Sequence, residues 1–233
     1  MTSSKKPKQL NPHQNRTETD TASTQSMSLR DIKDVYAEYA GCMPRLEWLD
    51  RAVIGRYRQA RFGDVDGRVL DVACGTGTNF RYLPETVDLV GVDISPEMLA
   101  NAETQLAEQG LDGTLSEMDA QNLGFPDDSF DAVISALSTC TFPDPIAALR
   151  EMDRVCKPDG TIRLVEHGCS DVGLIARLQE WRADAHYAKM GCRWTQEPSE
   201  VVTKAGLEVQ DTETGLFGTI TTFELTPSQE GHR

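Results

Sequence analysis

The chain has 233 residues, of which 39% are hydrophobic and 26% are charged, and its formal net charge is −14. This length suits one α/β domain and is too short for two ordinary ones. The proportions of hydrophobic and charged residues exclude a disordered or fibrous protein. A body this acidic repels phosphate backbones, so nucleic acid is excluded as a favoured partner. No apolar run approaches the roughly 18 residues that span a bilayer, and no transmembrane segment is expected.

Residues 1–28 are rich in Ser, Thr, Gln, Asn and Lys and offer almost nothing to bury. They are therefore predicted to be a disordered tail, followed by a single domain over residues 29–233. The tail has no apolar segment of the secretory kind, which favours a cytoplasmic location.

Lysine is scarce in the rest of the chain. Outside this tail the only lysines are Lys33, Lys157, Lys189 and Lys204. An acidic, lysine-poor surface resembles those of salt-adapted proteins, and an ordinary acidic cytosolic protein is the alternative. The six cysteines form no CxxC pair and are not spaced like metal ligands, so reduced free thiols and no metal site are expected.

Helical periodicity runs through residues 29–61, and strands and helices then alternate. Strands are expected at 68–73, 89–93, 114–118, 130–135, 161–166, 207–213 and 217–225, and helices at 78–83, 96–109, 146–156, 174–190 and 198–205, with a turn at 157–160. Ser95 and Pro96 mark the start of the second of these helices. The alternation predicts a Rossmann-like α/β fold with parallel strands, and the last two strands must be antiparallel because no helix fits between them.

The segment from Val69 to Gly77 reads VLDVACGTG, a strand that ends in a glycine-rich turn where the main chain can approach a ligand. A nicotinamide-binding fingerprint would need Gly or Ala three residues after Gly77, where this chain has Phe80. The departure favours a smaller ligand over a dinucleotide.

Two later aspartates follow strands in the same way. Asp93 lies 18 residues after Gly75, close to the spacing at which a carboxylate meets ribose hydroxyls. An Asp that caps a turn is the alternative. Ile94 is expected to lie against an adenine ring, and Asp119 to accept a hydrogen bond from its exocyclic amine.

With the segments FPDDSFDAV at 125–133 and LREMDRVCKPDG at 149–160, these four ordered motifs resemble the class I S-adenosylmethionine (SAM)-dependent methyltransferases. The resemblance is strongest to the type 11 group, which includes quinone-ring C-methyltransferases, and it covers roughly residues 69–166. It implies SAM as cofactor and a seven-stranded sheet in the order 3-2-1-4-5-7-6 with strand 7 antiparallel. Ala73 departs from the family, whose fullest motif has Gly there. The cofactor-binding residues that it implies are Asp71, Ala73, Gly75, Thr76, Gly77, Asp93, Ile94, Met98, Asp119 and Ala120.

A narrower resemblance involves VEH at 165–167, Trp181 and GCRWT at 191–195. These short motifs are similar to thiol methyltransferase-like proteins and bacterial phospholipid N-methyltransferases. They imply a small lipophilic acceptor of the quinone, lipid amine or thiol class. A cap built from residues 29–61 and an insertion at 168–196 is expected to cover the acceptor, with Trp181 and Trp194 as candidate walls and peripheral membrane contact allowed.

Catalysis would need a base only for some acceptors. His167 is the candidate, because it follows a strand at the edge of the sheet where ligands bind. A structural histidine is the alternative, and a non-catalytic SAM-binding regulator or partner subunit is the alternative to the enzyme.

Overall fold

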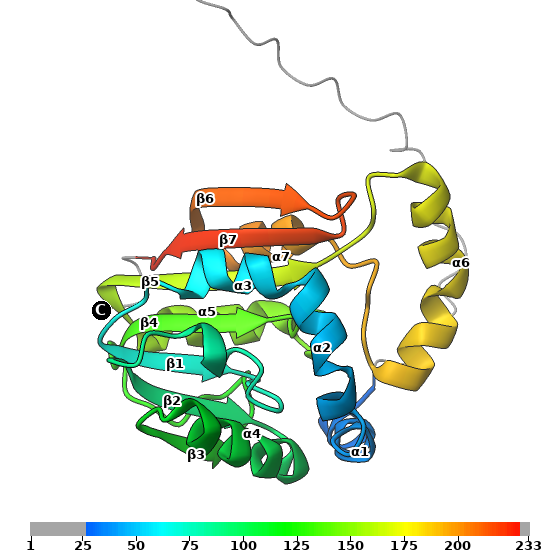
Figure 1. Ribbon diagram of the computed structural model, residues 1–233. Coiled ribbons are helices and arrows are strands. Elements are labelled where there is room, and N and C mark those ends of the chain that lie inside the picture. Colours follow the sequence, from blue (N-terminus) through cyan, green and yellow to red (C-terminus); the bar gives the residue numbers. More distant parts are fainter. Residues whose placement is uncertain (1–26, 229–233) are drawn as a thin grey trace, which may run out of the picture.

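A computed structural model describes residues 27–228 and shows a seven-stranded sheet in the order β3-β2-β1-β4-β5-β7-β6 (Figure 1). All neighbouring strands are parallel except β7, which runs antiparallel to both β5 and β6. This confirms the fold class and the sheet order. The strands are β1 (Arg68–Val72), β2 (Asp88–Asp93), β3 (Gly113–Glu117), β4 (Phe130–Ala136), β5 (Cys156–His167), β6 (Glu208–Gly215) and β7 (Ile220–Thr226).

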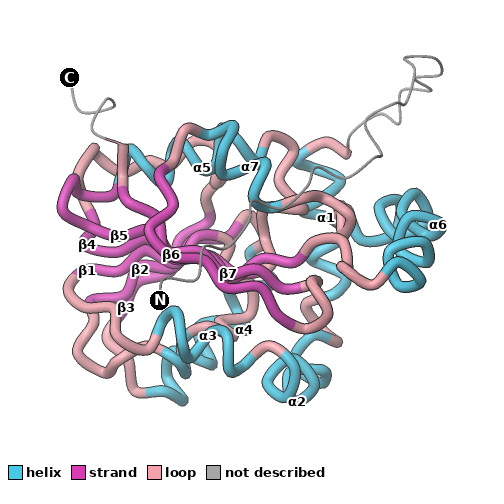
Figure 2. Tube along the Cα trace, turned by 90° about the horizontal axis from the view of Figure 1, so that it is seen from above, coloured by secondary structure: helices cyan, strands magenta, loops and turns pink. Residues whose placement is uncertain are grey.

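Helices cover both faces of the sheet (Figure 2). One face packs on α5 (Pro145–Val155) and α7 (Pro198–Ala205), and the other on α3 (Gly55–Phe62), the 3₁₀ turn η1 (Phe80–Tyr82) and α4 (Pro96–Gln109). Alternate side chains of β1 point into the two layers, Leu70 and Val72 into the first and Val69 into the second. The sheet is therefore buried on both sides, as a parallel sheet requires.

Three further helices lie at the carboxyl edge of the parallel strands (Figure 1). They are α1 (Leu29–Tyr39), α2 (Met43–Val53) and α6 (Gly173–Met190). The Ser28 side chain accepts a hydrogen bond from the Asp31 amide, and the Asp31 carboxylate bonds back to the Ser28 amide. This capping box fixes the start of α1, so Met27 and Ser28 belong to the ordered part of the chain. The remainder of the predicted tail, residues 1–26, lies outside the described residues.

Two local expectations were wrong. Residues 78–83 form only the short turn η1, because the Asn79 side chain is held by Asp71 and Pro84 stops any helix. The expected turn at 157–160 is instead a bulge within β5, since the pairing with β4 jumps from Phe130–Cys156 to Ala132–Thr161.

Within residues 27–228, no helix combines the length and the apolar character needed to cross a bilayer. The cytoplasmic location stays a prediction.

Candidate cofactor and acceptor site

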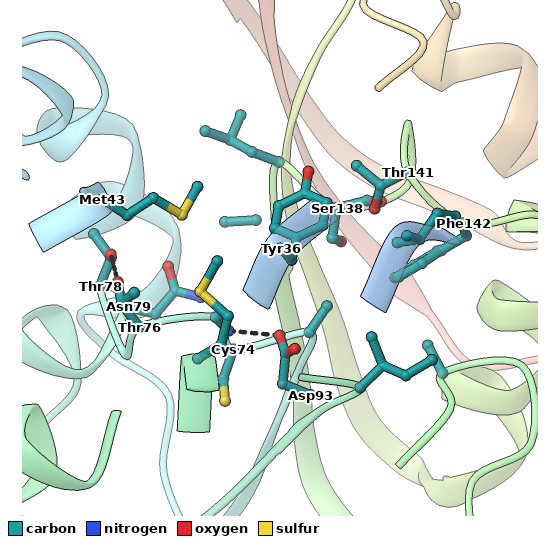
Figure 3. A pocket seen from close by; sticks show the side chains of 18 of the residues that line it. Tyr36, Met43, Cys74, Thr76, Thr78, Asn79, Asp93, Ser138, Thr141 and Phe142 are labelled. Atoms are coloured by element: carbon teal, nitrogen blue, oxygen red, sulfur yellow. Dashed lines mark hydrogen bonds between the residues drawn. The ribbon is translucent and has the colours of Figure 1, made fainter. Parts of the chain in front are cut away.

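A cavity of about 290 Å³ opens at the carboxyl edge of the parallel strands. This is the edge at which ligands bind in open α/β sheets. Figure 3 shows Tyr36, Ser138, Thr141 and Phe142 gathered on one side and Thr76, Thr78 and Asn79 on the other. The remaining lining residues include Leu29, Ile32, Met43, Glu47, Asp50, Arg58, Ala73, Cys74, Gly75, Asp93, Ile94, Met98, Met118, Asp119, Ala120, Ala136, Leu137 and Pro143.

The glycine-rich turn after β1 has three residues with positive φ: Ala73 at 55°, Gly75 at 56° and Gly77 at 81°. A Cβ added to Gly75 would meet nothing within 4 Å, whereas one added to Gly77 would lie 2.7 Å from the Phe80 ring. Gly75 therefore leaves its main chain open to the cavity. Gly77 is required by packing and is not among the described residues that line the cavity.

Asp93 joins this turn to the end of β2. Its Oδ2 accepts the Gly75 amide at 2.9 Å, and its Oδ1 accepts the Ser95 amide at 2.9 Å (Figure 3). Burial raises the pKa of Asp93, and the main-chain hydrogen bonds offset part of that rise. Each oxygen keeps further acceptor capacity for a ligand hydroxyl.

A buried polar chain lies behind the turn. Asn79 donates to both carboxylate oxygens of Asp71, at 2.9 and 3.0 Å, and accepts from Arg58, which also donates to Asp50 at 3.1 Å. Burial raises the pKa of Asp71 to about 7, although Asn79 and Arg58 act to lower it. Asp71 has no exposed surface and does not line the cavity, so its action on a ligand would be indirect.

Another part of the cavity lining is formed by residues after β2 and β3. Ile94, Met98 and Ala120 supply apolar surface there, and Asp119 supplies a carboxylate. Asp119 already accepts the Gln121 amide at 2.9 Å through Oδ1. Thr76, at the glycine-rich turn, also lines the cavity. Eight of the ten predicted cofactor residues therefore line it, and Asp71 and Gly77 do not.

The loop after β4 forms the remaining wall. Glu166 is buried and accepts the amides of Ser138 and Thr139, both at 3.3 Å, through Oε1. Burial raises the pKa of Tyr36, and the nearby Cys140 and Cys192 add to the rise. Tyr36 thus stays protonated over the cavity and can donate a hydrogen bond.

His167 is absent from the described residues that line the cavity. Its Nε2 lies 3.1 Å from the Cys140 sulfur and 3.3 Å from the Cys192 sulfur. Burial lowers the pKa of His167, but contacts with Cys192, Glu166 and the Trp194 main chain reverse the shift and raise it. The two cysteines were expected to be isolated thiols, and the structure brings them together instead.

The expected cap is only half present at the cavity. Residues from 29–61 line it, whereas no described residue from 168–196 does. Helix α6 stands away from the sheet (Figure 1) and buries none of its residues. Trp181 is 77% exposed and Leu178 54% exposed, so neither is a wall of this cavity. Trp194 is partly buried, stacks on His186 with the ring centroids 4.1 Å apart, and lines a separate hollow.

A family model described as a methyltransferase domain matches residues 70–164. The chain is 38% identical over 116 residues to a phosphatidylethanolamine N-methyltransferase of Cereibacter sphaeroides, covering 49% of this chain and 57% of that one. It is 32% identical over 144 residues to a ubiquinone/menaquinone biosynthesis C-methyltransferase of Bdellovibrio bacteriovorus, covering 60% of each. The chain thus spans less than two thirds of either relative.

The fold is similar to that of a SAM-dependent methyltransferase from Thermotoga maritima, with a TM-score of 0.65 and 20% identity over 84% of this chain and all of that one. Residues 70–164 thus match a methyltransferase domain, and the chain is similar to the class I SAM-dependent methyltransferases in sequence over part of its length and in fold. The cofactor that these matches support is SAM, as the four motifs implied.

The residues present fit this cofactor. Asp50 lines the cavity and its Oδ2 is buried without a hydrogen-bond partner. A buried carboxylate oxygen without a partner is costly, and the ammonium group of the SAM methionine is a chemically matched partner. The open space over Gly75 provides room for the same end of the molecule.

Asp50, Arg58 and Asn79 were missed by the sequence analysis. An arginine on a helix usually faces solvent, yet Arg58 is only 5% exposed. No local pattern distinguishes it from its exposed neighbour Arg56, because its partner Asn79 is 21 residues away. Asp71 itself was the available signal. A carboxylate within an apolar strand is buried and requires a polar partner, which here is Asn79.

Proposed function

We propose that this methyltransferase-family protein transfers the SAM methyl group to a small lipophilic acceptor. One observation carries the proposal: a single cavity joins the cofactor residues Gly75 and Asp93 to an apolar wall that includes Leu137 and Phe142. Apolar walls with a few polar groups suit a small molecule better than a peptide or RNA.

Bound SAM supplies an electrophilic methyl group on a sulfonium. We assign Asp93 to the ribose hydroxyls, Asp119 and Ile94 to the adenine, and Asp50 to the methionine ammonium. The roles of Asp93, Asp119 and Ile94 follow from the family resemblance and from their place in the cavity lining, and the role of Asp50 rests on its buried, unpartnered oxygen. They direct the sulfonium toward the side of the cavity that holds Tyr36 and Ser138 (Figure 3).

The rate would come from holding acceptor and methyl in line within a desolvated site. Tyr36 can donate a hydrogen bond that orients the acceptor. The proposal does not depend on His167 as a base, which stays a prediction. Acceptors that are already nucleophilic, such as a lipid amine, a thiolate or an electron-rich quinol ring, fit this arrangement best.

An exposed apolar row on α6 supports a lipid-borne acceptor. Leu174, Leu178 and Trp181 recur at helical spacing and are 81%, 54% and 77% exposed, and Phe217 beside them is 68% exposed. The Phe217 carbonyl accepts the Asp171 amide at 2.9 Å, which places it near the start of α6. Because the protein carries a charge of −14, we propose contact with a zwitterionic lipid surface rather than an anionic one.

Co-sedimentation with phosphatidylcholine vesicles tests this contact. Replacing Leu174 and Trp181 with Ser should abolish it, whereas Trp48→Ser, at another exposed tryptophan, should not. Equal sedimentation of all variants would contradict the proposed lipid contact, and so would an absence of vesicle binding in the parent protein.

Turnover with methyl-labelled SAM tests the function itself. The acceptor panel should contain quinols, phosphatidylethanolamine, small thiols and phenols, beside peptide and RNA. We expect label in at least one small lipophilic acceptor and none in the macromolecules. SAM binding without transfer to any fraction of a cell extract would favour the non-catalytic alternative.

A further inference from the structure

Three chain segments bring metal-ligating side chains to one point. Cys140 lies in the loop after β4, His167 ends β5, and Cys192 follows α6. The two sulfurs are 3.3 Å apart, and the His167 Nε2 is 3.1 Å from one and 3.3 Å from the other. The three atoms are the only cluster of this kind among residues 27–228.

These separations are close to those of a bound tetrahedral ion. Metal–sulfur bonds of about 2.3 Å and metal–nitrogen bonds of about 2.0 Å place ligand atoms roughly 3.5–3.8 Å apart. The observed cluster is a few tenths of an ångström tighter, so a small outward movement of each side chain would admit an ion. A disulfide would need the sulfurs to close to about 2.05 Å.

The surroundings hold the three side chains in place. Cys140 and Cys192 are 1% and 7% exposed. The Arg193 amide donates to the Cys140 carbonyl at 2.9 Å, which ties the two cysteine segments together. Nε2 of His167 faces the sulfurs, and the Trp194 main chain also interacts with this side chain and raises its pKa. A hydrogen bond from the ring nitrogen that does not touch the metal is what usually orients a metal-binding histidine.

We propose that Cys140, His167 and Cys192 bind one thiophilic divalent cation of the zinc type. Two thiolates and a neutral imidazole carry a charge of −2, which the ion neutralises, and the ligands release their protons to solvent. Three protein ligands leave the fourth position to water or to a small exogenous ligand, the arrangement of non-structural zinc sites.

The site would link the segment after α6 to the ends of β4 and β5. It adjoins the cavity, because Leu137, Ser138 and Thr141 of the Cys140 loop line the cavity wall. Since the folded state alone gathers the three ligands, the ion should raise the melting temperature in a concentration-dependent way. The proposal does not depend on methyl transfer.

Cobalt(II) is the probe, because cobalt–thiolate coordination absorbs in the near ultraviolet and tetrahedral cobalt in the visible. The reduced, metal-free full-length protein should bind one equivalent of Co²⁺ with both absorptions, and Zn²⁺ should displace it and raise the melting temperature. Cys140→Ser and Cys192→Ser should lose the absorptions. The matched controls Cys42→Ser and Cys169→Ser, outside the cluster, should keep them.

Circular dichroism and SAM titration of each variant identify any that fail to fold, and His167→Gln provides a third independent variant. Absence of the thiolate absorption in the folded parent would overturn the proposal. So would an absorption that survives in folded Cys192→Ser, or a Cys140–Cys192 disulfide that persists in the protein under reducing conditions.

Discussion

Asp71 is a carboxylate with no exposed surface, and burial raises its pKa to about 7. Between its ordinary pKa and that value the folded state binds more protons than the unfolded state. The free energy of unfolding must therefore fall as pH rises through this window, by up to about 1.4 kcal/mol per pH unit.

Asp71→Asn should remove this contribution. Urea denaturation between about pH 5 and 7 should give a parent whose stability declines relative to that of the variant as pH rises. Parallel pH profiles would show that Asp71 is charged throughout and that Asn79 and Arg58 compensate its burial fully.

Ala73 holds a φ of 55° at the position where the family's fullest motif has Gly. This conformation costs a residue with a Cβ about 1–2 kcal/mol, while glycine adds about 0.4–1 kcal/mol of entropy to the unfolded chain. We expect Ala73→Gly to stabilise the fold by about 0.5–1 kcal/mol. The control, Ala147→Gly within α5, should destabilise it by a similar amount. A loss at both positions in urea denaturation would contradict the argument from strain.

At the residue scale, the sequence predicted a side chain's role correctly where that role depends on residues next to it along the chain. Ser95 and Pro96 define the start of α4 as predicted, because a cap and a proline act locally. The cluster of Cys140, His167 and Cys192 was not predictable in this way. Its members lie 25 to 52 residues apart, and their meeting depends on where the sheet places three separate segments.

At the scale of elements, α1 connects the boundary of the tail to the cavity, since the helix that Ser28 caps also carries Tyr36. A chain that begins at Met27 should match the full-length protein in SAM affinity and melting temperature. Ser28→Ala in that shorter chain should cost about 1 kcal/mol, because the Asp31 amide loses its partner.

Urea denaturation and SAM calorimetry check both parts of this expectation. Loss of SAM binding on removal of residues 1–26 would show that the tail contributes to the site. An unchanged stability in Ser28→Ala would show that packing of Ile32, rather than the cap, fixes the start of α1.

Element periodicity predicted most helices and strands but misplaced the role of α6. Its tryptophan and leucines suggested a wall of the acceptor site, because apolar side chains at helical spacing usually face a core. The structure exposes them instead. A hydrophobic pattern identifies which face of a helix is apolar, but it does not identify what packs against that face.

At the scale of the whole molecule, the charge of −14 is the dominant feature. Repulsion among carboxylates is screened as salt rises. We expect the melting temperature to climb with potassium chloride into the molar range, as in salt-adapted proteins. A falling curve would instead show that ion pairs such as Arg154 with Glu151 outweigh the repulsion.

We expect the cavity at the carboxyl edge of the sheet to bind SAM through Asp93. Isothermal titration calorimetry of the full chain tests it most directly. The parent should bind one SAM per chain, and Asp93→Ala should bind at least about tenfold more weakly, or 1.4 kcal/mol. Asp88→Ala, at the exposed opposite end of the same strand β2, should bind as the parent does. Unchanged affinity in a folded Asp93→Ala protein, or binding of a nicotinamide dinucleotide in place of SAM, would contradict the account.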